Sequence, residues 1–133
     1  MFRSEAQRAR ACTALCERAG LFGMWTSSGP SDEATALFEA GGGPLSSGER
    51  VVLLAAWAFW NSAETVPLAD VIYRLDEKNT CAIATLMIAV VQGGHAIDAW
   101  IVAMESGAGA SAGQVRRPSL RAGRLSSVGR GPR

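Results

Sequence analysis

The stretch SSGERVVLLAAWAFWN, residues 46 to 61, decides the fold of this 133-residue chain. Ser46 followed three residues later by Glu49 is the pattern of a capping box, in which each side chain accepts a hydrogen bond from the other residue's backbone amide. From Val51 to Trp60 the apolar residues cover every side of a helix instead of one face. We therefore expect a central helix enclosed on most sides. The run is well short of the roughly 18 apolar residues that a membrane span requires, so we predict no membrane association.

A second apolar helix is expected over residues 77–92, capped by Asp76 and carrying CAIATLMIAVV in its middle. Shorter amphipathic segments, at residues 4–19, 31–40, 68–75 and 95–105, are available to cover the two apolar helices. The chain lacks the alternation of apolar and polar residues that strands require. We predict an all-α fold, a compact bundle of five to six helices formed by residues 1–106, with residues 46–61 and 77–92 at its centre.

The charge is distributed unevenly along the chain. Residues 1–106 carry seven Arg or Lys and all twelve Asp or Glu, which gives −5, whereas residues 107–133 carry six Arg and no acid, which gives +6. The second segment consists mainly of Gly, Ser, Arg and Pro, and it has too few apolar residues to offset the entropy of ordering. We predict an acidic helical body followed by a disordered basic C-terminal tail.

Three cysteines are an odd number and too few for a secreted disulfide scaffold. The N-terminal sequence MFRSEAQRARAC lacks the apolar region of a secretory signal peptide, so we expect a cytoplasmic protein. The whole chain is rich in Arg, Ala and Gly and poor in Lys. This composition is typical of a GC-rich gene, which favours a bacterial or phage origin.

Cys12 and Cys16 share a helix face, but only Cys81 and His95 remain as further zinc ligands, from distant segments. We predict no metal and no cofactor.

The segment LSSGER, residues 45–50, resembles the signature motif of ABC-type ATPases and their chromosome-maintenance relatives. In that family a Ser–Gly turn at a helix N-terminus contacts the γ-phosphate of a nucleotide held by the opposite subunit. The longer segment GPLSSGER, residues 43–50, has the spacing of a Walker A motif, but Glu49 and Arg50 stand where Lys and Ser or Thr belong. We therefore interpret the segment as a helix cap.

Residues 65–94 resemble a helix-turn-helix, whose second helix would have to offer Arg, Lys, Asn or Gln to DNA. This segment offers CAIATLMIAVV instead, on a body whose charge phosphates would repel. His95 and Asp98 have no accompanying nucleophile motif. The remaining carboxylates are scattered along the chain. We therefore predict a packing role for the two helices and no enzymatic activity.

We expect a small non-enzymatic accessory or regulatory protein that binds another protein, either itself or a partner, through an apolar patch with an acidic rim. Tryptophan is enriched among binding hot spots, so the candidate interface residues are Trp25, Trp57, Trp60 and Trp100. One alternative is a nucleic-acid-associated regulator that uses the basic tail and the degenerate helix-turn-helix, with contacts from Arg116, Arg117, Arg121, Arg124, Arg130 and Arg133. Another is a helical small-molecule binder or enzyme with a pocket between helices.

Overall fold

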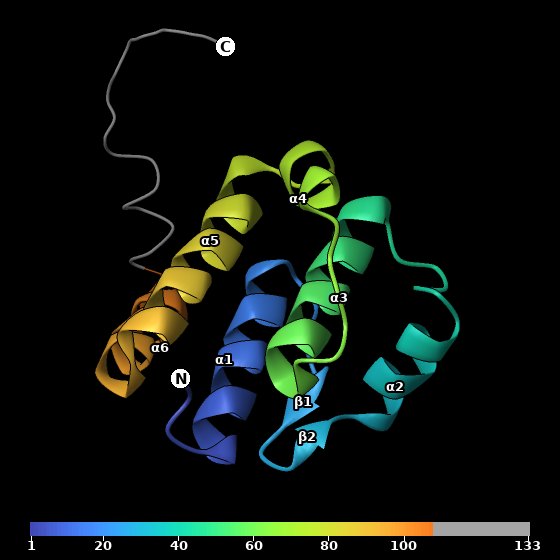
Figure 1. Cartoon of the computed structure of the whole chain (residues 1–133). Helices are drawn as coiled ribbons and strands as arrows, with labels where there is room; N and C mark the ends of the chain where they lie inside the picture. The colour runs from blue at the N-terminus through green and yellow to red at the C-terminus, as the bar shows by residue number, and fades with distance from the viewer. Residues whose placement is uncertain (108–133) are drawn as a thin grey trace, which may run out of the picture.

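The computed structural model describes residues 1–107 of the chain, and the predicted basic tail lies outside the described residues from 108 onward. Residues 1–107 form six helices: α1 (Glu5–Arg18), α2 (Asp32–Glu39), α3 (Ser47–Asn61), α4 (Leu68–Arg74), α5 (Glu77–Gln92) and α6 (Gly94–Ser106) (Figure 1). A two-residue antiparallel pair, β1 (Trp25–Thr26) with β2 (Gly29–Pro30), is the strand structure found between α1 and α2. The prediction of an all-α bundle is confirmed.

The helices begin where the sequence places capping residues. The side-chain oxygens of four N-cap residues accept hydrogen bonds from amides of the first helical turn, at Ser4, Ser31, Ser46 and Asp76. The capping box of α3 is complete: Glu49 N–H donates to Ser46 Oγ at 3.2 Å, and Ser46 N–H donates to Glu49 Oε1 at 2.9 Å. These bonds satisfy backbone donors that have no partner within the helix, so the helix boundaries follow from local chemistry.

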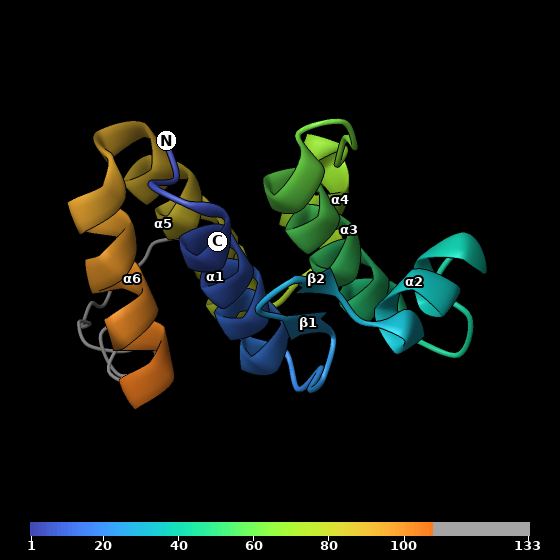
Figure 2. The same cartoon turned by 90° about the horizontal axis from the view of Figure 1, so that it is seen from below.

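The central helix of the bundle is α1. Figures 1 and 2 show α1 between α3 on one side and the α5–α6 pair on the other, with α2 on the outer side of α3. Apart from Gln7, the buried positions of α1 are mostly small residues, which allow neighbouring helices to approach closely: Ala9, Ala11, Cys12, Ala14, Leu15 and Cys16. The expectation that residues 77–92 lie at the centre is wrong, because α5 packs on α1 and α6 by one side only.

The predicted enclosure of α3 is largely confirmed. Its residues Val51, Val52, Leu53, Ala55 and Ala56 are buried, and the aromatic residues that follow are half-buried. Within residues 1–107, no helix is both long enough and apolar enough to cross a membrane.

Candidate functional site

The helix α5 has two apolar sides. One side consists of Ala82, Ile83, Leu86 and Ala89, which are buried against the rest of the bundle. The other side, which we call the α5 stripe, consists of Ala84, Met87, Ile88 and Val91 and faces solvent; Met87 and Ile88 are each 56% exposed and Val91 is 87% exposed. The spacing i, i+3, i+4, i+7 places these four residues on one face of a helix. Such a face normally packs against another helix.

An apolar groove of about 410 Å³ lies beside the α5 stripe. Its walls come from α3, α4, α5 and the loop between α3 and α4, and the lining residues are Ala55, Ala58, Phe59, Val66, Leu68, Val71, Ile72, Thr80, Ile83, Ala84 and Met87. In Figure 1 the α3–α4 loop runs along α3, and α4 lies between the ends of α3 and α5. The groove and the α5 stripe share Ala84 and Met87, so they form a continuous surface.

Two residues of α4 extend this surface. Leu68 and Ile72 line the groove and are nevertheless exposed. The C-terminal end of α4 approaches α3 closely, since the Arg74 carbonyl oxygen lies 3.0 Å from the position that a Cβ on Gly48 would take. We use the term apolar face for the α5 stripe together with Leu68 and Ile72.

The polar group in the groove already has a partner. Thr80 Oγ1 donates a hydrogen bond to the Val71 carbonyl oxygen at 3.2 Å, which links the start of α5 to α4. All other residues that line the groove are apolar. The groove therefore presents apolar surface without a free polar group to orient a ligand.

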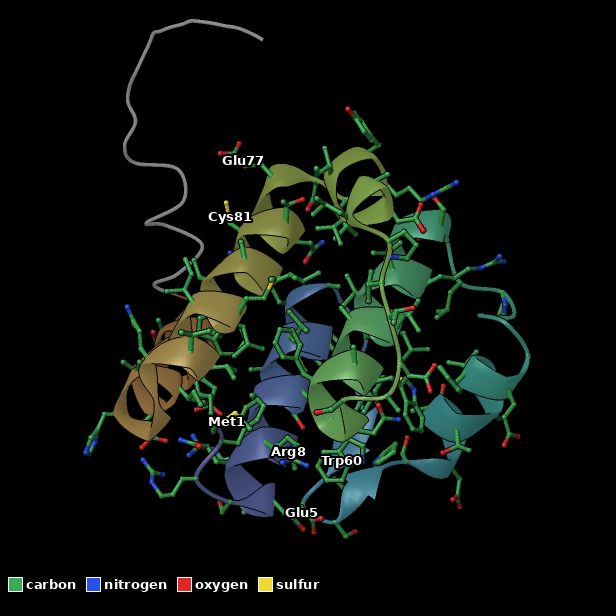
Figure 3. All side chains as sticks on the ribbon, in the orientation of Figure 1. Met1, Glu5, Arg8, Trp60, Glu77 and Cys81 are labelled. Carbon is green, nitrogen blue, oxygen red and sulfur yellow. The ribbon has the colours of Figure 1, made fainter. Side chains whose placement is uncertain are left out.

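Charged residues collect at the N-terminal end of α5 and leave the rest of this helix neutral. Asp76, Glu77 and Lys78 are consecutive, whereas residues 79–92 contain no charged side chain. In α4, Arg74 Nε forms an ion pair with Asp70 Oδ1 at 3.0 Å. Figure 3 shows Glu77 at one end of α5 and Met1 near the other end. Charge therefore lies at both ends of the α5 stripe: Asp76, Glu77 and Lys78 at the start of α5, and the ammonium group of Met1, which donates to the Val90 carbonyl oxygen, at the other end.

The three cysteines fall into two environments. Cys12 and Cys16 are buried in α1, where burial raises the pKa of both thiols, that of Cys16 to about 12. Cys81 is exposed on α5. Its pKa is raised mainly because part of the residue is buried, and to a smaller extent by the Glu77 carboxylate. All three are therefore protonated near neutral pH. Among the described residues, no group of three or more His, Cys, Asp or Glu side chains is placed to hold a metal ion.

The structure brings three of the four predicted interface tryptophans together. The ring centroid of Trp25 lies 5.5 Å from that of Trp57 and 6.5 Å from that of Trp60, and Phe38 of α2 packs on Trp57 at 4.6 Å. Trp100 is buried in α6, where its Nε1 donates to Thr85 Oγ1 at 2.9 Å. None of the four belongs to the apolar face. A role for them in binding stays a prediction, as does nucleic-acid contact by the six tail arginines, which lie outside the described residues.

The LSSGER segment uses its polar groups for folding. Ser46 and Glu49 bind each other's backbone amides, and Gly48 packs against the end of α4. The Glu49 carboxylate occupies the helix N-terminus where a phosphate would have to bind. The arrangement supports the interpretation of this segment as a helix cap.

The helix-turn-helix resemblance covers α4, the turn and α5. The solvent-facing side of α5 is formed mainly by the apolar side chains of the α5 stripe, which make no hydrogen bonds to bases or phosphates. His95 is in the first turn of α6 and Asp98 follows that turn; Asp98 accepts hydrogen bonds from Arg3 Nη2 at 2.6 Å and from the buried Gln7 Nε2 at 2.9 Å. These bonds connect the N-terminal residues to α6, which is a structural role.

The chain matches no protein-family model, no curated protein and no solved structure. Function is therefore inferred from the chemistry of the described surface alone.

Proposed function

We propose that this chain is a small non-enzymatic accessory or regulatory protein that binds another protein through the apolar face of α4 and α5. The observation that supports this most directly is the size and continuity of the face. Five large apolar side chains on it, Leu68, Ile72, Met87, Ile88 and Val91, are each more than half exposed and adjoin an apolar groove. Contiguous exposed apolar surface of more than a few hundred Å² is typical of interaction sites.

The charge of the body supports a role in selecting the partner. Residues 1–106 carry a net charge of −5, and Asp76 and Glu77 border the apolar face. Charged residues at the rim of an interface affect the rate and specificity of association more than the affinity. We propose that the apolar face provides the binding energy and that its acidic end disfavours arrangements that bring a partner's acidic residues against it.

The groove also has the volume of a small-molecule site, since such sites span roughly 300–1,000 Å³. Small-molecule sites combine apolar walls with a few polar groups that orient the ligand, and the Thr80 hydroxyl is already bonded to the Val71 carbonyl. Apolar side chains from a protein need no such group. The chemistry of the groove therefore favours a protein over a metabolite.

The test is an affinity purification from the native host with the chain tagged at its N-terminus, comparing wild type with Met87→Glu and Val102→Glu. Met87 lies on the apolar face and is 56% exposed, whereas Val102 lies on α6 and is 59% exposed. The two variants thus add the same charge at similarly exposed positions. We expect a protein that persists at high salt, is lost with Met87→Glu and is kept with Val102→Glu.

Two results would contradict the proposal. Partners that are retained equally by both variants would show that binding does not involve the apolar face. Salt-sensitive recovery of nucleic acid that disappears on deletion of residues 107–133 would favour the nucleic-acid alternative instead.

A further inference from the structure

We infer that the apolar face binds a second copy of this chain, with the two α5 helices packed antiparallel across a two-fold axis. The inference rests on the proposed function and names the partner. In a two-fold dimer the same patch is used by both protomers. The face must therefore be complementary to itself in area, shape and charge.

The area is sufficient for a dimer. From their exposed fractions, the five large side chains of the apolar face present roughly 600 Å² of accessible surface, and specific interfaces bury about 600–1,000 Å² on each partner. The half-buried groove residues Phe59 and Val66 border this surface and would add to the area buried. The face is thus at the lower end of the range for a stable, specific dimer.

The shape suits helix-to-helix packing. The four stripe residues repeat with helical spacing, so their side chains form a ridge along α5. Packed helix axes lie about 8–10 Å apart, and Ala84, the smallest of the four residues, leaves space for a larger side chain of the opposite helix. The groove lies directly beside the ridge and provides space for side chains of the opposite ridge.

The charge favours the antiparallel direction. Residues 79–92 carry no charged side chain, so two stripes can meet without burying a charge, which would be costly. A parallel arrangement would place Asp76 and Glu77 against the same residues of the second copy. An antiparallel arrangement separates these carboxylates to opposite ends of the interface. With the stripe centred on the axis, Ala84 of one copy faces Val91 of the other.

The first test is sedimentation equilibrium of the full chain, under reducing conditions, from low micromolar to several hundred micromolar concentration. We expect the wild-type mass to rise toward twice the chain's 13.9 kDa. Ile88→Glu would place a charge in the interface and raise the dissociation constant about tenfold or more. Val102→Glu is expected to dimerise like wild type. Circular dichroism checks that both variants are folded.

The second test determines the helix direction by disulfide trapping in a Cys81→Ser background, with oxidised glutathione as the oxidant. Ala84→Cys and Val91→Cys chains are oxidised separately and as a mixture. The antiparallel arrangement predicts efficient covalent dimers in the mixture and few in either variant alone. Dimers from Ala84→Cys alone, with none specific to the mixture, would show parallel helices and overturn the inferred direction.

The outcomes separate this inference from the proposed function. A wild-type chain that stays monomeric throughout would overturn self-association. If a host protein is nevertheless recovered with the wild-type chain and lost with Met87→Glu, the apolar face binds a different protein and the proposed function stands. If Met87→Glu loses no host protein, the inferred dimer and the proposed function both fail. A wild-type dimer that Ile88→Glu leaves intact would place the interface elsewhere and overturn the inference.

Discussion

Two isoleucines on α5 provide a direct test of the division between its buried and exposed sides. Ile83 is 5% exposed and Ile88 is 56% exposed, although both lie in the middle of the same helix. Replacing either with Ala removes three carbon atoms and increases helix propensity by the same few tenths of a kcal/mol. The difference between the two variants therefore reports burial alone.

The expected magnitudes follow from the exposed fractions. For Ile83→Ala the lost transfer free energy and the resulting cavity together cost about 3 kcal/mol, within the range of about 2–5 kcal/mol for buried isoleucine. For Ile88→Ala less than half of the side chain is buried, no cavity is enclosed, and the cost is about 1 kcal/mol. The Ile83 variant should therefore be less stable than the Ile88 variant by about 2 kcal/mol.

Urea denaturation followed by circular dichroism measures both free energies of unfolding, first at a chain concentration low enough for monomers. Equal losses in the two variants would refute the assignment of Ile88 to an exposed face. At high concentration the wild type gains stability if it dimerises, because association favours the folded state. The loss caused by Ile88→Ala should then grow with concentration, whereas the loss caused by Ile83→Ala should not.

Two further predictions concern the parts of the fold that hold α1, α3 and α6 in place. The hydrogen bond from Arg3 lowers the pKa of Asp98 below its ordinary 3.8. The stability that the ionised Asp98 contributes is therefore present above pH 3.8 and is lost as the pH falls below that value. In urea titrations at acid pH, Asp98→Asn should lose less free energy of unfolding than the wild type does. Gly42 has φ of +102°, and a Cβ there would lie 2.4 Å from Arg50 Cγ, so Gly42→Ala should lower the free energy of unfolding by about 1–3 kcal/mol. Gly41→Ala, at φ +68° with no atom within 4 Å of the new Cβ, should cost less, and equal costs would contradict the role of the Arg50 contact.

The sequence predicted the helices well because their ends depend on neighbouring residues. Ser4, Ser31, Ser46 and Asp76 each cap a helix by a bond to the amide three residues on, and such bonds can be predicted from spacing. The inward face of α6 was also predictable, since Ile97, Trp100 and Ile101 follow one helical period and are buried.

The position of each helix in the bundle was less predictable. The central place of α1 depends on small buried residues such as Ala11 and Cys12, which contribute little to a hydrophobicity pattern but allow three helices to approach. In α5 the run CAIATLMIAVV contains residues of a buried face and residues of an exposed face, interleaved along the sequence. Because both faces are apolar, periodicity alone does not distinguish the side that faces solvent. Tryptophan is frequent at interfaces in general, and this frequency does not indicate where each of the four tryptophans packs.

The exposure of the α5 stripe has a geometric cause in the lengths of the helices. At 1.5 Å per residue, the seven residues of α4 extend about 10 Å, whereas the sixteen residues of α5 extend about 24 Å. The end of α4 lies close to Gly48 of α3, so α4 reaches only the N-terminal part of α5. Within residues 1–107, no helix therefore covers the outer side of the segment from Met87 to Val91, although α6 and α1 cover its inner side. In the antiparallel pair that we propose, each α5 would cover the part of the other that α4 does not reach.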